Sequence, residues 1–187
     1  MLRSALLLLI AATVPPEPPP QATAPVPPPK GVATAHVRRV GEWLGSPPLL
    51  LDKLEGKVML VHSTMPTSGC PLDGSVTPAL NTLGDDFKTK GLVVVALYQS
   101  DVVNPSDLQE IKRCVRRLQP HFALLTGTHR GDFGRWAIGD RPTDLASVTF
   151  LVDKRGTIRR VAPGESLALG TKEYDGMKAT IEKVLAE

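Results

Sequence analysis

The 187 residues are enough for one well-buried core and leave little room for a second domain. The 22 basic and 19 acidic residues give a formal net charge of +3, and aromatic residues make up only 4% of the chain. Nucleic-acid binding usually requires a basic surface with aromatic side chains among the charges, so this composition argues against a nucleic-acid partner. The densest basic cluster, KRCVRR at 112–117, is expected to spread its charges over the solvated face of a helix.

The N-terminus has the pattern of an export signal. One positive side chain, Arg3, precedes a ten-residue apolar run at 5–14, and an ordinary membrane-spanning helix needs about 20 such residues. The run fits the apolar centre of a secretory signal, with the small residues Ala11, Ala12 and Thr13 near the expected cleavage point. We therefore expect residues 1–14 to be a signal peptide and the protein to be exported to a periplasmic or other extracytoplasmic space. An uncleaved N-terminal anchor is the alternative.

Nine prolines stand among the fifteen residues 15–29. Proline lacks the amide donor and fixes φ, so this segment is unsuited to a helix or an interior strand. An extended spacer of this length would reach roughly 45 Å, at about 3.1 Å per residue. Residues 15–31 are therefore predicted to be a linker that can associate the folded domain with an envelope surface, or else a tail without a spacing role.

Beyond residue 31 the hydrophobic patterns predict alternating strands and helices. Two helical crossovers imply parallel strands with right-handed connections, and a late hairpin would add an antiparallel edge. The proline at position 78 is expected to kink the first helix. The predicted elements are a strand at 57–63, a helix at 72–90, strands at 91–100 and 121–125 around a helix at 104–119, a short helix at 131–139, a hairpin at 147–162 and a final helix at 171–187.

A cysteine between the first long strand and its helix narrows the choice among α/β folds. From about residue 43 to 187 the sequence resembles the thioredoxin-like superfamily, in particular its exported redoxin branches. LLLDKLEGKVMLVHS at 49–63 and TFLVDKRGTIRRVAPGE at 149–165 resemble TlpA-like periplasmic thiol–disulfide proteins. PHFALLTGT at 120–128 and CP at 70–71 resemble the Sco/SenC family of copper delivery, and TSGC at 67–70 matches the Thr-x-x-Cys core of peroxiredoxins. The resemblance implies a thioredoxin-like α/β domain over 32–187, with a central mixed sheet flanked by helices.

Each of these branches would keep Cys70 and lack one of its partners. In the TlpA-like pattern Asp73 stands where the second cysteine belongs. In the Sco-like pattern Pro66 replaces the first metal-binding cysteine. The peroxiredoxin pattern keeps Thr67, but its supporting arginine would fall near Ser147.

Two hypotheses therefore remain for Cys70. If a helix begins at Pro71, Cys70 is its N-cap, where unpaired amides and the positive helix end favour a thiolate. A hydroxyl of Thr67 could donate a hydrogen bond to that thiolate, whereas Asp73 would disfavour it. Cys70 is then either a reactive thiol or a cysteine that has lost its chemistry.

The other cysteine, Cys114, lies near the apolar stripe of the predicted helix 104–119. It is either a buried free cysteine or a resolving cysteine, as in some two-cysteine peroxiredoxins. A bridge to Cys70 is expected to need local unfolding, because disulfide-bonded Cα atoms must lie within about 7 Å.

Thiol-based redox chemistry at Cys70 is the expected function, without a cofactor. A thiolate would attack a disulfide or a peroxide, and Cys114 or an outside thiol would resolve the product. The partners would be a thiol or disulfide protein, or a peroxide. One alternative is a Sco-like copper metallochaperone using the soft ligands Cys70, Met65 and His62, although the last two could simply pack. A non-catalytic thioredoxin-like binding module is another.

Overall fold

The computed structural model describes residues 43–45, 54, 56–64, 70, 72, 74–99, 105–128, 147–163 and 167–187. The predicted signal peptide, the proline-rich linker and the predicted helix at 131–139 lie outside these residues. So do Met65, Thr67, Pro71 and Asp73.

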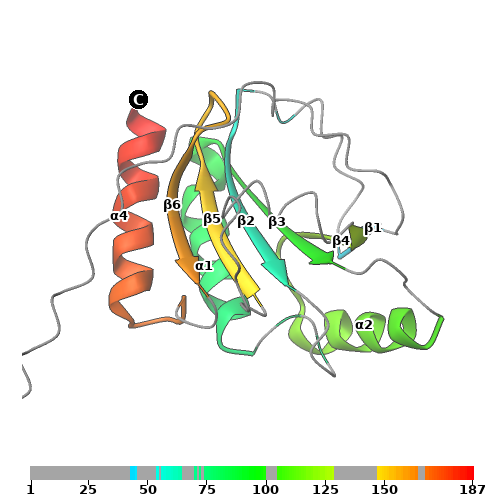
Figure 1. Ribbon diagram of the computed structural model, residues 1–187. Coiled ribbons are helices and arrows are strands. Elements are labelled where there is room, and N and C mark those ends of the chain that lie inside the picture. Colours follow the sequence, from blue (N-terminus) through cyan, green and yellow to red (C-terminus); the bar gives the residue numbers. More distant parts are fainter. Residues whose placement is uncertain are drawn as a thin grey trace, which may run out of the picture.

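Six strands form one mixed sheet in the order β1-β4-β3-β2-β5-β6 (Figure 1). The strands are β1 Trp43–Leu44, β2 Val58–Thr64, β3 Leu92–Gln99, β4 Ala123–Thr128, β5 Ser147–Val152 and β6 Ile158–Pro163. The helices are α1 Val76–Phe87, α2 Pro105–Leu118 and α4 Lys172–Ala186, and a 3₁₀ turn, η3, covers Lys88–Lys90.

Strands β2, β3 and β4 are parallel, whereas β5 runs antiparallel to β2 and pairs with β6 as a hairpin. The predicted parallel strands and antiparallel edge are therefore confirmed. The parallel strands end on the same side of the sheet, and α2 lies at that end (Figure 1). In open α/β sheets, ligands bind at the carboxyl ends of the strands, so this end is the first place to look for a functional site.

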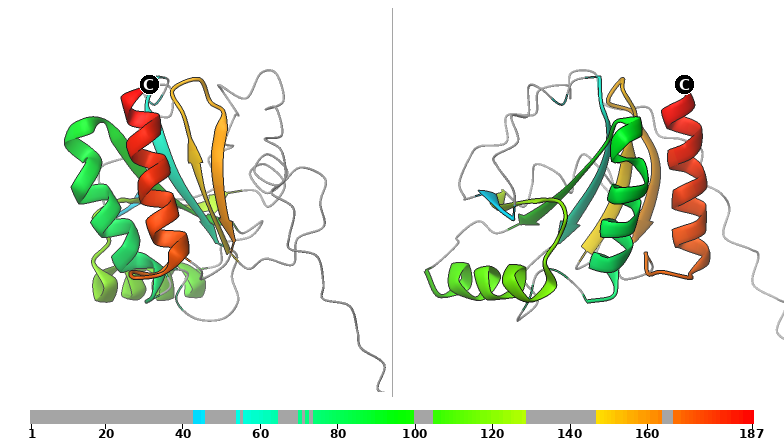
Figure 2. Two further views of the ribbon diagram at one scale, coloured as in Figure 1. Left: turned by 90° about the vertical axis from the view of Figure 1, so that its left-hand side faces the viewer. Right: turned by 180° about the vertical axis from the view of Figure 1, so that it is seen from behind.

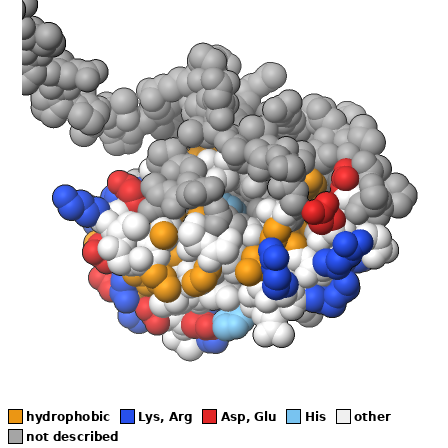
Figure 3. Space-filling model, turned by 90° about the horizontal axis from the view of Figure 1, so that it is seen from below, with side chains coloured by type: hydrophobic (Ala, Val, Ile, Leu, Met, Phe, Trp, Pro, Cys, Tyr) orange, Lys and Arg blue, Asp and Glu red, His pale blue; other side chains and the backbone are white. Residues whose placement is uncertain are grey.

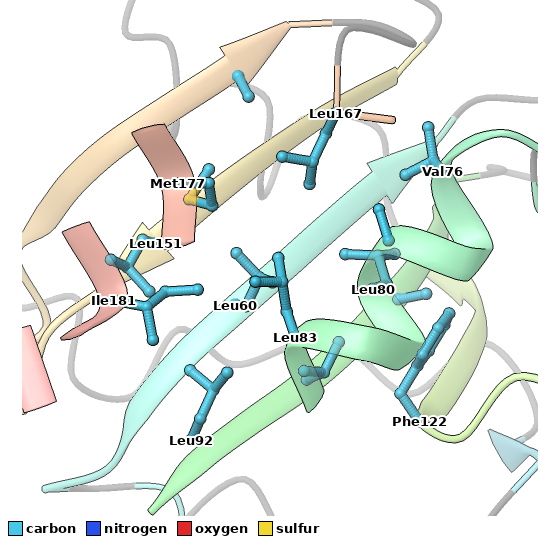
Figure 4. Close-up of a cluster of buried hydrophobic side chains, with 14 of the residues drawn as sticks. Leu60, Val76, Leu80, Leu83, Leu92, Phe122, Leu151, Leu167, Met177 and Ile181 are labelled. Atoms are coloured by element: carbon cyan, nitrogen blue, oxygen red, sulfur yellow. The ribbon is translucent and has the colours of Figure 1, made fainter. Parts of the chain in front are cut away.

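Alternating side chains of the strands face two separate apolar clusters. Helices α1 and α4 cover the same face of the sheet (Figure 2), and Figure 4 shows Leu60 and Leu151 of that face packed among their side chains. On the opposite face Val61, Val95 and Phe150 are buried together. Burying large aliphatic and aromatic side chains contributes about 1.5–3 kcal/mol each, which makes these clusters the main source of stability.

Helix α1 begins later than the sequence analysis predicted. It starts at Val76 with Ser75 at the N-cap, so the prediction of a helix from residue 72 was wrong. The residues Gly74 and Ser75 form a turn first, because glycine and serine compete with helix formation before the apolar stripe begins. With this start Pro78 falls in the first turn, where its missing amide has no intrahelical partner to lose, so the reason for a kink disappears.

Helix α4 has a side-chain N-cap and acidic residues in its first turn. The Thr171 side-chain oxygen accepts from the Tyr174 amide at 3.2 Å, and Glu173 and Asp175 occupy the first turn, where negative charge is favoured. Among the described residues, no helix has the length and apolar character needed to cross a membrane.

Candidate functional site

A disulfide joins Cys70 to Cys114 at the end of the sheet where α2 lies. Cys70 stands between β2 and α1, and Cys114 lies in α2, 44 residues further along the chain. Their Cα atoms are 5.3 Å apart, within the usual range for bridged cysteines. The bond therefore connects two elements that the sheet topology brings together at the ends of β2 and β3.

The geometry corrects two expectations about Cys114. Its reading as a free cysteine was wrong, because its sulfur is bonded to that of Cys70. The expectation that a bridge needs local unfolding was also wrong, since the folded chain already places the two Cα atoms within bonding range. The predicted position on the apolar stripe is confirmed: Cys114 is only 4% exposed and belongs to the cluster with Ile111.

The two cysteines differ in how well solvent reaches them. Cys114 is buried, whereas Cys70 is partly exposed and packs against the edge of the same cluster. Thiol–disulfide exchange depends on which sulfur an incoming thiolate can reach. Cys70 is therefore the accessible end of this bond.

The Leu72 carbonyl lies beside both sulfurs. Its oxygen is 2.9 Å from Sγ of Cys70 and 3.9 Å from Sγ of Cys114. The Leu72 side chain is 1% exposed and anchors this backbone in the core. In the reduced protein the carbonyl is placed to accept a hydrogen bond from the Cys70 thiol.

The helix-start argument for Cys70 does not hold in this structure. Ser75, five residues later, is the N-cap of α1, so the free amides of the first turn are not adjacent to Cys70. Among the described residues, its bonded partner in α2 and the Leu72 carbonyl lie beside the Cys70 sulfur instead. Thr67, the other predicted site residue, lies outside the described residues.

His62, one member of the predicted copper ligand set, is buried near the end of β2. Its Nδ1 lies 2.8 Å from the Thr149 hydroxyl on the neighbouring strand β5, in direct register. Cys70, a second member, is oxidised in the disulfide, and Met65 lies outside the described residues. Within the described part of the chain, no group of three or more His, Cys, Asp or Glu side chains could hold a metal ion.

Polar contacts join α1 to the residues that directly follow α2. The Asn81 side chain accepts a hydrogen bond from the His121 amide at 2.8 Å, and its amide group donates to the Gln119 carbonyl at 3.4 Å. Nδ1 of His121 lies 2.7 Å from the Asp85 carboxylate, whose pKa is lowered by hydrogen bonds with Lys88 and His121. These contacts hold the helix that carries Cys114 against the helix that follows Cys70.

Two features of the site were missed from the sequence. The Leu72 carbonyl is a backbone group and leaves no signature in residue types. The Asn81 contact depends on the spatial approach of α1 and α2, although a polar residue among the apolar positions of a predicted helix was a signal that could have been followed.

No protein-family model and no curated protein sequence matches the chain. Among solved structures, it resembles a thiol:disulfide interchange protein from Chlorobium tepidum with a TM-score of 0.56 and 15% identity, over 87% of this chain and 98% of the other. It resembles a secreted thiol-disulfide isomerase from Corynebacterium glutamicum with a TM-score of 0.55 and 13% identity, over 74% and 77% of the two chains. A DsbF homologue from Corynebacterium diphtheriae gives a TM-score of 0.53 and 15% identity, over 76% and 82%. The chain therefore has the thioredoxin-like fold that the sequence predicted.

Proposed function

We propose that this chain is a thiol–disulfide exchange protein whose Cys70–Cys114 pair alternates between a disulfide and a dithiol. The observation that carries the proposal is a disulfide between one partly exposed and one buried cysteine, at the carboxyl ends of parallel strands. Proteins of similar fold that are named for thiol–disulfide interchange or isomerisation support it.

In the reducing direction the Cys70 thiolate attacks one sulfur of a substrate disulfide. A mixed disulfide forms between Cys70 and the substrate, and the other substrate sulfur leaves as a thiolate and takes up a proton. The Cys114 thiolate then attacks Sγ of Cys70 and releases the second substrate sulfur. The substrate gains two electrons and two protons, and the protein is left with its own disulfide. The oxidising direction is the same sequence reversed.

The proposed partners are thiol or disulfide proteins outside the cytoplasm. The export signal predicted at 1–14 supports this location, and disulfides persist in oxidising compartments. The likeness to a secreted isomerase supports the same location. The proline-rich segment at 15–31 would place the domain near an envelope surface.

A single-turnover experiment tests the proposal. Reduced protein, freed of reductant, is mixed with an equimolar disulfide substrate such as insulin. The wild type should yield reduced substrate and oxidised protein, Cys114→Ser should stop at a mixed disulfide, and Cys70→Ser should not react. Equal reduction by wild type and Cys70→Ser would refute the proposal.

The wild type and substitutions at Cys70 also separate the other functions expected from the sequence. Peroxide consumption lost in Cys70→Ser, with no insulin reduction by the wild type, would identify a peroxidase instead. Cu(I) retained against a chelator and lost in Cys70→Ser would identify a copper protein. Partner capture that persists in Cys70→Ala would identify a binding module.

A further inference from the structure

The helix that carries Cys114 has an uneven charge distribution. Its acidic residues, Asp107 and Glu110, stand in the first half, whereas residues 112–117 contain four cations and no acid. Arg113, Arg116 and Arg117 are exposed, and within the described residues no ion pair joins them to a carboxylate. We call these three residues the arginine face of α2.

The two acids act on β3 from the first half of α2. Glu110 also stands one helical turn before Arg113, but no ion pair joins the two among the described residues. Burial raises the pKa of Tyr98, near the end of β3, and the negative charges of Asp107 and Glu110 raise it further. Both carboxylates therefore lie close enough to β3 to influence its phenol. On α1, Asp85 is engaged by Lys88 and His121. The second half of α2 itself carries no acid, so it stays basic.

The arginine face borders the disulfide. Arg113 precedes Cys114 directly, and Arg117 stands three residues after it, which makes Arg117 a neighbour of Cys114 on the helix surface. Figure 3 views the molecule from this end, and basic side chains gather on the side where α2 lies. Arg116 and Arg117 also suit the negative end of the helix dipole, but Arg113 lies outside the last turn.

We infer that the arginine face of α2 selects substrates whose reactive cysteines are flanked by acidic residues. This inference rests on the proposed function, since it names the substrate class of the same disulfide. Charge complementarity raises the rate of encounter and disfavours like-charged partners, and the effect weakens as salt screens it. An acidic segment docked on Arg113 and Arg117 would bring its sulfur beside the partly exposed Cys70.

Two peptides of equal length and with the same internal disulfide test the inference. One carries three glutamates beside a cysteine and the other carries three lysines. At low ionic strength we expect the reduced full-length protein to react with the acidic peptide about tenfold faster. We expect 0.5 M NaCl to reduce this ratio to about one.

Arg113→Glu/Arg117→Glu should abolish or reverse the preference. The matched control is Lys154→Glu/Arg155→Glu, which makes the same change in net charge in the exposed β5–β6 turn at the other end of the sheet. The control should keep the preference. Equal rates for the two peptides, or the same loss in both variants, would overturn the inference, whereas no reaction with either peptide would overturn the proposed function.

Discussion

The two ends of the sheet are cross-linked by different chemistry. At the carboxyl ends of β2 and β3, a covalent bond joins Cys70 to Cys114. The β5–β6 turn and the C-terminal end of α4 lie at the other end (Figure 1). There Arg159 of β6 donates to Asp153 at 3.2 Å and to Glu187 at 2.5 and 2.9 Å. The first link joins residues 44 apart in sequence and responds to reductant. The second joins residues 6 and 28 apart and responds to protons.

This difference separates a site from a scaffold. The disulfide has one partly exposed cysteine and is bordered by the arginine face of α2, whose three residues form no ion pair among the described residues. In the ionic link, by contrast, Arg159 is paired with two carboxylates, and Asp153 also accepts hydrogen bonds from the Arg155 and Thr157 amides at 2.9 Å each. Reagents that break one link should therefore leave the other intact, and the predictions below use that property.

Reducing the disulfide should have the largest effect on stability. The bridge joins residues 44 apart in sequence and so restricts the unfolded chain. Loss of such a bridge typically lowers the free energy of unfolding by about 2–4 kcal/mol. Urea unfolding of the oxidised and reduced protein measures the difference. The Cys70→Ser/Cys114→Ser variant is the control and should be insensitive to reductant. Unchanged stability of the wild type after reduction would show that the bond does not restrict the chain.

Asp153→Ala should lower the free energy of unfolding by about 1.5–3 kcal/mol, because it leaves two backbone amides and Arg159 without this acceptor. Asp153→Asn keeps a side-chain oxygen that can accept from the turn amides and removes only the charge, so this variant should lose less stability than Asp153→Ala. Urea unfolding of both variants, with and without reductant, gives the values. A cost that depends strongly on reduction would contradict the independence of the two ends.

Acid should weaken the ionic link at Asp153 and leave the disulfide bond itself intact. Burial works to raise the pKa of Asp153, but the amides of Thr157 and Arg155 together with Arg159 outweigh it, and the pKa lies below the ordinary 3.8. A depressed folded-state pKa contributes stability that is present above the unfolded value and is lost as pH falls through the folded value. Between pH 5 and pH 2 the wild type should therefore lose more stability than Asp153→Asn. Parallel losses in the two proteins would exclude this contribution.

The smallest expected effect is a gain in stability beside the disulfide. Gln119 directly follows α2 with φ of +43°, a left-handed conformation that glycine adopts without a steric cost. Gln119→Gly should stabilise the protein by about 0.5–1 kcal/mol in urea unfolding. Gln109→Gly, within α2, is the opposite control and should destabilise by a similar amount. A destabilising Gln119→Gly would mean that the side chain contributes more than the backbone strain costs.

The sequence was sufficient to predict the order of elements because long apolar runs and helical periodicity mark β2, β3, α2 and α4 clearly. It did not give the start of α1, since Pro71 and Ser75 both carry helix-start chemistry and only packing decides between them. The count of two cysteines allowed a bridge. Its formation depends on the approach of α2 to the segment after β2, and that approach is a property of tertiary packing. The same reason hides the contact between Arg159 and Glu187, which are 28 residues apart.

The most direct test of the account is the state of the two cysteines in the protein purified without reductant. The protein is alkylated under denaturing conditions, before and after reduction, and its intact mass is measured. The account predicts no adduct before reduction and two after it, as expected for a Cys70–Cys114 disulfide. Two adducts before reduction would mean free thiols and would contradict the bond on which the proposed function depends.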